Sequence, residues 1–333
     1  MKIHGSVFLI LPIFLFSIDS NGTTIIIKDR GKQCGRERKM KILLTGASGQ
    51  LGSDCRMVLE KDYEIIAPDK EEFDITSWDK VITGIYQLSP DIILNCAAFT
   101  KVDECETERK LSERINVEGP RNLAQGAARY DKTIVHISSD FVFNGRKRMP
   151  QPYFEDDPMS PISFYGQTKM ESEMAVKQNA RNYIIIRTGW LYGITGDSFV
   201  KEILRLAIRK GREPISVVND QYGSPTWSFK LSQQIKVLID NGREGVYHAT
   251  SEGYCSRYEW AKYLLEKMEI KAPIVPCTSK DCPSPAARPS NSILENRQLK
   301  TEGLNIMTQW QRDLDIFIEK YGEGLLAEEG NAA

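Results

Sequence analysis

From residue 40 onward, short uninterrupted apolar runs alternate with longer stretches of helical pattern. The runs are rich in β-branched residues and show no polar alternation, which is typical of strands buried on both faces of a parallel sheet. They are KILLT, YEIIA, DIILNCAA, KTIVHIS and NYIIIRT, and helical stretches follow at 51–60, 78–88, 109–129 and 165–178. The pattern predicts an α/β fold with a Rossmann-like, doubly wound parallel sheet and helices on both faces.

The regular alternation weakens after about Gly193. Further helical stretches lie near 199–209, 229–241 and 258–268, with the loop NDQYGSPTW and the proline-rich segment CPSPAARPSNS between or after them. We interpret this part as a smaller C-terminal α/β domain that follows the sheet. The predicted organisation is a sheet domain over 40–192 and a second domain over 193–325.

The first 39 residues fall outside this pattern. Residues 6–18 form an apolar run of 13 residues, shorter than the ~20 that a membrane-spanning helix needs and similar to the core of a signal peptide. Basic residues follow the run in excess, which favours a cytoplasmic location for the downstream chain. Because a strand pattern begins directly at Lys41, we interpret residues 1–39 as a leader or a mis-assigned start. A membrane tether or export is the lesser alternative.

Composition and charge exclude several classes of protein. With 44 Lys+Arg against 45 Asp+Glu, the net charge of -1 gives no reason to expect a nucleic-acid partner. Seven cysteines without framework spacing argue against a disulfide-built secreted domain, and with only three histidines they argue against a zinc site. We therefore expect a small-molecule substrate, no bound metal and no membrane partner.

A glycine-rich turn follows the first predicted strand. The sequence ILLTGASGQLGSD places Gly46, Gly49 and Gly52 at the start of a helix, where backbone N–H groups can approach a pyrophosphate. The spacing differs from the G-x-G-x-x-G of many dehydrogenases, yet its position favours dinucleotide binding. Asp69, at the end of the second strand, would favour NAD by binding a ribose, whereas Lys70 beside it would tolerate a 2′-phosphate. The choice between NADH and NADPH stays open.

Tyr165 and Lys169 are four residues apart, so a helix would present both on one face. A phenol has a reference pKa of ~10, and a nearby ammonium lowers it toward the range in which a proton can be exchanged with a substrate oxygen. Alone, the pair also fits a surface helix with a partly buried tyrosine. Its position downstream of the glycine turn makes the combination specific.

These motifs together resemble the extended short-chain dehydrogenases/reductases, and most closely the dTDP-4-dehydrorhamnose reductase family. The matching stretches, in the family's order, are TGASGQLG, NCAAFTKVDECE, INVEGPRNLA, ISSDFVFNG, YGQTK, RTGWLYG, NDQYGSPTW and ARPSNSIL. The resemblance implies that residues 40–192 bind NADPH or NADH and that residues 193–325 mainly bind substrate. It also implies reduction of the C4 ketone of dTDP-4-dehydro-L-rhamnose to dTDP-L-rhamnose, a precursor of cell-wall polysaccharide, and it leaves a homodimer open.

The resemblance assigns roles at the reacting centre. Ser139 would hydrogen-bond the substrate carbonyl, Tyr165 would deliver the proton, and Lys169 would hold the nicotinamide ribose and lower the pKa of the tyrosine. Asn116, in INVEG, would support the lysine through water. A helix-surface amide is the alternative interpretation of Asn116.

The resemblance also assigns binding residues. Cofactor contacts are expected at Gly46, Gly49, Gln50, Leu51 and Gly52 for the pyrophosphate, at Asp69 for a ribose, at Asp74 and Ile75 beside adenine, and at Ala97 and Ala98 under the adenosine-side ribose. Trp190 would pack against the deoxysugar, although a tryptophan there also fits the core. Gln221, Tyr222 and Arg288 would help to close the nucleotide-sugar pocket, although an arginine before proline can also brace a loop.

Two other classes of function remain as alternatives. One is a reductase or epimerase of another nucleotide-sugar. The other is a non-catalytic regulatory subunit resembling the methionine adenosyltransferase β subunit, which has a related fold. Sugar-nucleotide dehydratases carry an Asp-Glu pair after the catalytic Ser/Thr, whereas here Asp140 is followed by Phe141, so dehydration is disfavoured. The stretches RTGWLYG and NDQYGSPTW favour the reductase.

Overall fold

The computed structural model describes residues 16–18, 24–26, 38–211 and 213–332. Most of the apolar run at 6–18 and of the predicted leader over 1–39 therefore lies outside the described residues. Phe16–Ile18 (β1) and Thr24–Ile26 (β2) form a short antiparallel pair. The rest of the described chain, from Lys39, is a separate unit. In the described ranges, no helix combines the length and apolar character needed to cross a membrane.

The unit from Lys39 is built on a six-stranded parallel sheet in the spatial order β12-β7-β6-β5-β3-β4. The strands are β3 (Lys41–Thr45), β4 (Glu64–Ile66), β5 (Ile92–Asn95), β6 (Thr133–Ser139), β7 (Asn182–Thr188) and β12 (Gly245–His248). The first five are the apolar runs predicted as strands, so the predicted sheet is confirmed. The sixth comes from the range that was assigned to the second domain.

The order of the strands places a crevice beside β3. After β3 the chain runs to β4 on one side and then returns to β5 on the other. Helices that leave β3 and β5 in opposite directions open a crevice at the carboxyl ends of these two strands, which is where open α/β sheets bind ligands. The glycine turn follows β3 directly at this point.

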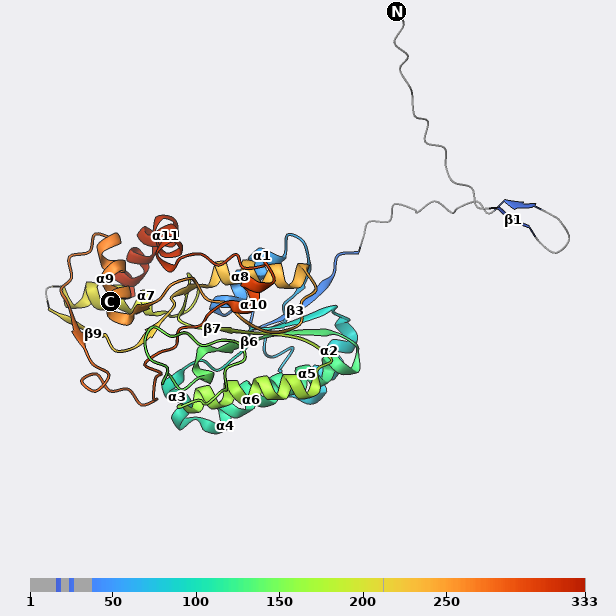
Figure 1. Cartoon of the computed structure of the whole chain (residues 1–333), viewed down its shortest axis with the longest axis horizontal. Helices are drawn as coiled ribbons and strands as arrows, with labels where there is room; N and C mark the ends of the chain where they lie inside the picture. Colours follow the sequence, from blue (N-terminus) through green and yellow to red (C-terminus); the bar gives the residue numbers. More distant parts are fainter. Residues whose placement is uncertain (1–15, 19–23, 27–37, 212, 333) are drawn as a thin grey trace, which may run out of the picture. The chain divides into compact units, whose positions relative to one another are not determined.

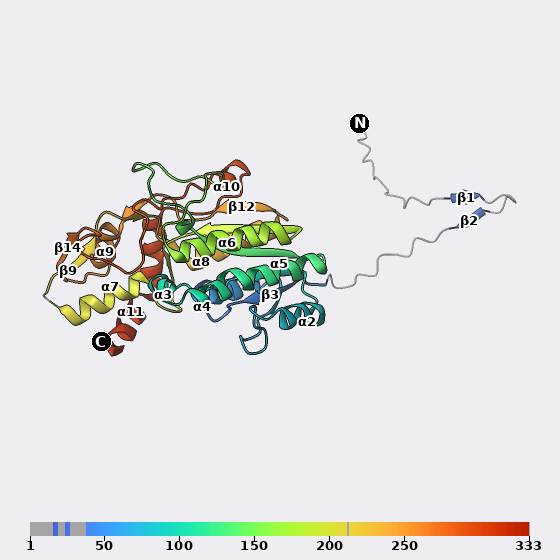
Figure 2. The ribbon, with the colours of Figure 1, turned by 90° about the horizontal axis from the view of Figure 1, so that it is seen from below.

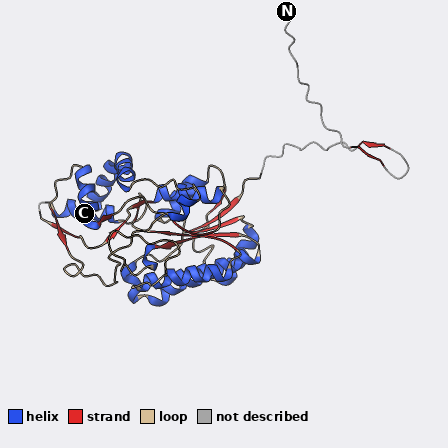
Figure 3. Ribbon diagram, viewed as in Figure 1, coloured by secondary structure: helices blue, strands red, loops and turns tan. Residues whose placement is uncertain are grey.

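Helices cover both faces of the sheet (Figure 1). Helices α1 (Gln50–Leu59) and α8 (Ser228–Asp240) lie on one face, and α2 (Trp78–Leu88), α5 (Gly119–Arg129) and α6 (Phe164–Asn179) lie on the other (Figures 1 and 3). Figure 2 is seen from the side of α2, α5 and α6. Ile42 and Leu44 of β3 pack in the core with α1 and α8, whereas Leu43 packs in the core with α2 and α5. Both faces of the strand are buried, which explains its unbroken apolar sequence.

The helix predicted over 109–129 is divided into three consecutive segments. They are α4 (Arg109–Glu113), a π-helical turn η1 (Arg114–Glu118) and α5. Pro120 lacks the N–H that would bond to the carbonyl of Asn116 in a regular α-helix, which favours a local change of helical form here. The short helix α3 (Val102–Thr107) precedes these segments and was not predicted.

The C-terminal part surrounds a second, aromatic-rich core. Helices α7 (Phe199–Lys210) and α9 (Arg257–Lys267) lie beside the parallel pair β9 (Ile215–Val218) and β14 (Ile274–Cys277), and α11 (Trp310–Ala332) packs on both helices. Tyr192, Trp227, Trp260 and Phe317 are buried in this core. The remaining short elements are η2 (Asp140–Val142), β8 (Leu191–Tyr192), β10 (Tyr222–Gly223), β11 (Thr226–Trp227), β13 (Cys255–Ser256) and α10 (Arg297–Thr301).

Candidate active site

Two cavities meet at the carboxyl edge of the sheet. One, of about 620 Å³, lies against the glycine turn and the end of β4, and we call it the glycine-turn cavity. The other, of about 530 Å³, is lined by Ser139, Tyr165 and Lys169, and we call it the tyrosine cavity. Gly49, Cys96 and Ala98 belong to the walls of both. An elongated ligand can therefore extend from one cavity into the other.

The glycine turn has the form of a pyrophosphate site. Gly46 has φ +71°, and a Cβ at this residue would lie 2.6 Å from the backbone nitrogen of Ala97. A Cβ on Gly52 would lie 2.0 Å from the carbonyl oxygen of Gly46. Gly49 begins α1 without a side-chain cap, and no acidic residue follows in the first turn. The backbone N–H groups in the first turn of α1, at the positive end of the helix, are therefore open to an anion. The buried Nε2 of Gln50 also has no hydrogen-bond partner among the described residues.

The residues expected beside adenosine line the glycine-turn cavity; they are Asp69, Asp74, Ile75, Ala97 and Ala98. Asp69 Oδ1 accepts a hydrogen bond from the backbone nitrogen of Glu72 at 2.8 Å, which fixes the turn after β4. Lys70 lines the same cavity, and so does Arg56 of α1, which sequence reasoning missed. Gln50 and Leu51, by contrast, lie in the wall of the tyrosine cavity.

The three residues predicted for the reacting centre lie together. Ser139 ends β6, and Tyr165 and Lys169 lie in the first turns of α6. All three line the tyrosine cavity, and none is more than 8% exposed. The Nζ of Lys169 donates a hydrogen bond to the carbonyl oxygen of Ile137 at 2.7 Å.

Burial dominates the protonation of this centre. It raises the pKa of Tyr165 well above the ordinary value, against a lowering hydrogen bond from Ser139, and the charge of Asp140 raises it further. The predicted lowering by Lys169 is therefore wrong for this structure, because desolvation of the phenolate dominates. Burial lowers the pKa of Lys169 to about 8, although the charge of Glu173 opposes this. Tyr165 keeps its proton at neutral pH, which is the form a proton donor needs.

Asn116 is fully buried, which excludes the surface-amide interpretation. Its Oδ1 accepts a hydrogen bond from the backbone nitrogen of Phe99 at 2.8 Å, and its Nδ2 donates to the Phe99 carbonyl at 3.0 Å and to Thr168 Oγ1 at 3.1 Å. Asn116 therefore joins the loop after β5 to the helix that carries Tyr165. Its support of Lys169 through water stays a prediction.

A buried ion pair fixes α6 against the sheet. Glu173 accepts hydrogen bonds from Nε and Nη2 of Arg187, both at 2.8 Å, and from Ser138 Oγ at 2.6 Å. The side chains of Glu173 and Arg187 are 0% and 2% exposed. Burial alone would raise the pKa of Glu173, but the hydrogen bonds and charge of Arg187 outweigh burial, and the pKa is lowered.

Trp190 lies where the resemblance placed it, in the wall of the tyrosine cavity. It follows β7 with φ +52°, and its Nε1 donates a hydrogen bond to Ser292 Oγ at 3.1 Å. Its ring also stacks on that of Trp260 at 5.8 Å between centroids. The indole therefore lines the cavity and also packs on the C-terminal core. This position is compatible with a contact to the sugar and with a role in the core.

The other residues expected to bind substrate lie outside the walls of the two cavities described above. Gln221 Nε2 donates a hydrogen bond to Ser279 Oγ at 3.0 Å, and Tyr222 pairs with Ser256 in a short strand ladder. Arg288 donates from both terminal nitrogens to Asp103 at 3.0 and 2.9 Å. Arg288 thus braces its loop against α3, as the alternative interpretation held.

Three charged residues of the tyrosine cavity were missed by sequence reasoning as site residues: Asp140, Asp197 and Arg257. Asp140 accepts a hydrogen bond from Ser139 Oγ at 2.9 Å, and its Oδ2 is buried without a partner. Burial raises the pKa of Asp140 to about 6, against hydrogen bonds from Ser292 and Ser139 that lower it. In sequence, Asp140 was signalled only by its place after Ser139, and Arg257 by nothing at all.

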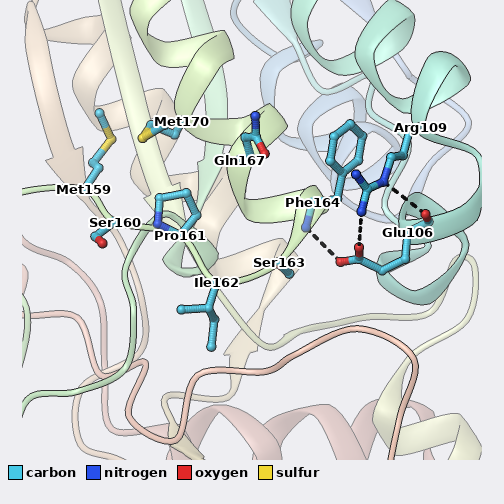
Figure 4. A pocket seen from close by; sticks show the side chains of 10 residues that line it. All are labelled: Glu106, Arg109, Met159, Ser160, Pro161, Ile162, Ser163, Phe164, Gln167 and Met170. Atoms are coloured by element: carbon cyan, nitrogen blue, oxygen red, sulfur yellow. Dashed lines mark hydrogen bonds and ion pairs between the residues drawn. The ribbon is translucent and has the colours of Figure 1, made fainter.

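A third hollow, of about 500 Å³, lies at the start of α6 and is shown in Figure 4. Glu106 and Arg109 point toward one another on one side of it, with Nη2 and Oε2 3.4 Å apart. Glu106 Oε1 also accepts a hydrogen bond from the backbone nitrogen of Phe164 at 2.8 Å. These polar groups bind one another. We therefore interpret the contacts around this hollow as structural, holding the start of α6, the helix that carries Tyr165.

A doubly wound sheet with an open glycine turn, and a buried serine, tyrosine and lysine in the adjoining cavity, define a short-chain dehydrogenase/reductase that uses a nicotinamide dinucleotide. Residues 40–323 match the family model described as the RmlD substrate binding domain. The chain belongs to this family, which confirms the resemblance found in the sequence.

Named relatives and solved structures agree with this assignment. The chain is 36% identical to the dTDP-4-dehydrorhamnose reductase of Aggregatibacter actinomycetemcomitans, covering 82% of this chain and 97% of that protein. It is also 36% identical to the spore coat polysaccharide biosynthesis protein SpsK of Bacillus subtilis, covering 84% and 97%. The crystal structure of dTDP-4-dehydrorhamnose reductase from Bacillus anthracis in complex with NADP superposes with a TM-score of 0.81 at 38% identity, covering 85% of this chain and all of that one.

Proposed function

We propose that this chain reduces the C4 ketone of dTDP-4-dehydro-L-rhamnose to dTDP-L-rhamnose with NADPH or NADH. The observation that carries the proposal is the placement of Ser139, Tyr165 and Lys169 in one buried cavity that adjoins an uncapped glycine turn. Family membership and relatives that bear the name of this activity support it. We place the reaction in the cytoplasm and leave the assembly as a homodimer to experiment.

The residues of the tyrosine cavity supply position, polarity and a proton. A bound reduced nicotinamide supplies the hydride for the carbonyl carbon. Ser139 orients and polarises the carbonyl by a hydrogen bond to its oxygen, and Tyr165 donates its proton to the alkoxide that forms there. Lys169 holds the nicotinamide ribose. Tyr165 is protonated at neutral pH, as a proton donor must be.

The remaining roles belong to the two cavities and to the loops outside their walls. Gly46, Gly49, Gln50, Leu51 and Gly52 bind the pyrophosphate, while Asp69, Asp74, Ile75, Ala97 and Ala98 surround the adenosine. Trp190 packs against the deoxysugar, and the loops with Gln221, Tyr222 and Arg288 close over it. Residues 40–192 bind the cofactor and residues 193–325 mainly bind substrate, with β12 completing the sheet from the second range.

The test is to follow oxidation of NADPH and NADH by the purified chain with enzymatically generated dTDP-4-dehydro-L-rhamnose. Tyr165→Phe should lower kcat by about 10²- to 10⁴-fold, because the general acid is lost, and should leave NADPH affinity nearly unchanged. Absence of oxidation by the wild-type chain with either cofactor would overturn the proposal. Stoichiometric copurification with a transferase would then favour the regulatory-subunit alternative.

A further inference from the structure

The tyrosine cavity offers few cations to an anionic substrate. Among the residues described in its wall, the positively charged side chains are Lys169 and Arg257. Lys169 is committed to the carbonyl of Ile137 and lies beside Tyr165, where a nicotinamide ribose must fit. A nucleotide-sugar carries a negatively charged diphosphate. Its binding therefore needs a cation other than Lys169, on the side of the cavity that receives the substrate.

Arg257 is fixed as the first residue of α9. The preceding Ser256 forms a capping box with Glu259, in which Ser256 Oγ accepts from the Glu259 nitrogen at 3.1 Å and Glu259 Oε2 accepts from the Ser256 nitrogen at 2.7 Å. The guanidinium carbon lies 3.8 Å from the ring centroid of Trp190 and 5.0 Å from that of Phe199. Such stacking holds the plane of the guanidinium while its N–H groups stay at the rim.

The guanidinium of Arg257 is charged but has no hydrogen bond to any residue that the structure describes. Burial lowers its pKa to about 10, and the charge of Asp140 opposes this lowering, so the group stays protonated at neutral pH. Asp140 itself is 2% exposed and keeps one carboxylate oxygen without a partner. The cavity therefore holds a stacked cation whose donors are unused.

The other candidate cation is already engaged. Arg288 uses both terminal nitrogens on Asp103, and its Nη1 also donates to the carbonyl of Ala286 at 3.0 Å. Binding a phosphate at Arg288 would require these hydrogen bonds to break. Arg257 can bind a phosphate without breaking a side-chain hydrogen bond to a described residue. It also lines the same cavity as Ser139 and Tyr165.

Building on the proposed function, we propose that Arg257, rather than Arg288, binds the diphosphate of the nucleotide-sugar. The planar fork of Arg257 can donate two parallel hydrogen bonds to phosphate oxygens, and the indole of Trp190 holds the fork in place. The sugar then extends from Arg257 past Trp190 toward Ser139 and Tyr165.

Calorimetric titration of the wild type and Arg257→Gln with dTDP, thymidine and NADPH tests this assignment. Affinity for dTDP should fall by about 10- to 100-fold, the value of charge-assisted hydrogen bonds, while affinities for thymidine and NADPH stay unchanged. KM for the nucleotide-sugar should rise with a smaller change in kcat. Lys262→Gln is the matched control, because Lys262 lies on the same helix, is exposed and pairs with Glu266 at 3.7 Å.

Arg257→Lys keeps the charge without the fork and serves as a second variant if the glutamine variant does not fold. It should lose several-fold in dTDP affinity. Wild-type dTDP affinity in the folded Arg257 variants would overturn this inference and leave the reductase assignment standing, as would a loss of dTDP affinity in Arg288→Gln alone. Failure of the wild-type chain to bind dTDP at all would overturn the proposed function itself.

Discussion

At the scale of single residues, the charge of Lys169 is easily lost. Burial lowers its pKa to about 8, against the raising charge of Glu173, so the ammonium becomes neutral in mildly alkaline solution. We predict that NADH affinity falls as the pH rises through about 8, because a neutral amine binds ribose hydroxyls less strongly. Fluorescence titration from about pH 7 to about pH 10 measures this. Lys169→Arg stays charged over this range, and an identical fall in that variant would rule out Lys169 as the source.

Gly223 determines how far Trp190 reaches into the tyrosine cavity. A Cβ at this position would lie 2.4 Å from Cε2 of the indole and 2.8 Å from Ser292 Oγ. We predict that Gly223→Ala displaces the indole, at a stability cost of about 1–3 kcal/mol, and raises the substrate KM several-fold more than it changes NADH affinity. Steady-state kinetics and cofactor titration separate the two effects. Gly324→Ala is the control, since nothing lies within 4 Å of a Cβ there; an unchanged KM in the Gly223 variant would contradict the prediction.

The sequence predicted some residues of the site and missed others. Ser139, Tyr165 and Lys169 stand in motifs whose chemistry depends on residue type and spacing, so their meeting in one cavity was predictable. Arg257 reaches that cavity only because α9 packs against Trp190, more than sixty positions earlier in the chain. No local pattern encodes such a contact. The direction of the pKa shift of Tyr165 was mispredicted, because a four-residue spacing does not show how deeply the phenol is buried.

At the scale of elements, α6 is held at its first turn and near its middle. Ser163 Oγ accepts from the nitrogen of Gly166 at 3.1 Å, and Glu106 accepts from the nitrogen of Phe164 at 2.8 Å. Further along, Glu173 binds Arg187 of β7. These attachments determine where the first turn of α6, and hence Tyr165, lies relative to Ser139.

Loss of Glu106 should loosen this first turn. In Glu106→Ala the nitrogen of Phe164 loses its acceptor and the positive helix end loses a carboxylate, which should lower the free energy of unfolding by about 0.5–2 kcal/mol. We also expect a lower kcat, because Tyr165 directly follows Phe164. Urea unfolding and turnover measure the two effects. Glu113→Ala, on exposed α4, is the control; equal effects in both variants would refute the role of Glu106.

Helices and strands were predicted correctly where the sequence has a clear hydrophobic periodicity. They were missed where tertiary packing determines the structure. The strands and the helices α1, α2 and α6 carry strong periodicity and lay within a few residues of their expected bounds. Helix α11 was missed because Gly322 and Gly324 weaken its helical propensity, yet Leu314, Phe317 and Leu325 bury its apolar side in the C-terminal core. The strands β9 and β14 pair over four residues each, too short for a distinctive pattern.

At the scale of the whole molecule, the Glu173–Arg187 pair should govern stability in acid. The pKa of Glu173 is lowered in the folded chain, so its stabilising effect is present above the unfolded pKa of about 4.3 and is lost as the pH falls through the folded value. We predict that Glu173→Gln lowers the free energy of unfolding by about 3–5 kcal/mol at neutral pH, because Arg187 stays buried without its partner.

Urea unfolding of the wild type and Glu173→Gln at neutral pH and at about pH 3, well below the unfolded pKa, measures this effect. The gap between the two proteins should narrow in acid. Glu171→Gln, on the exposed side of α6, should match the wild type at both pH values. A gap that stays constant with pH would show that the ionisation of Glu173 is not its source.

The position of β12 in the sheet has a consequence for synthesis on the ribosome. The strand beside β7 comes from residues 245–248, after α7, β9 and α8 have been translated. Until then the apolar stretch Ile184–Ile186 has an open edge that can pair with other nascent chains. Stalled chains with residues only up to 192 outside the exit tunnel should therefore be cut by protease throughout, and protection should begin once residue 248 has emerged. A chaperone that holds the growing chain would act in that interval.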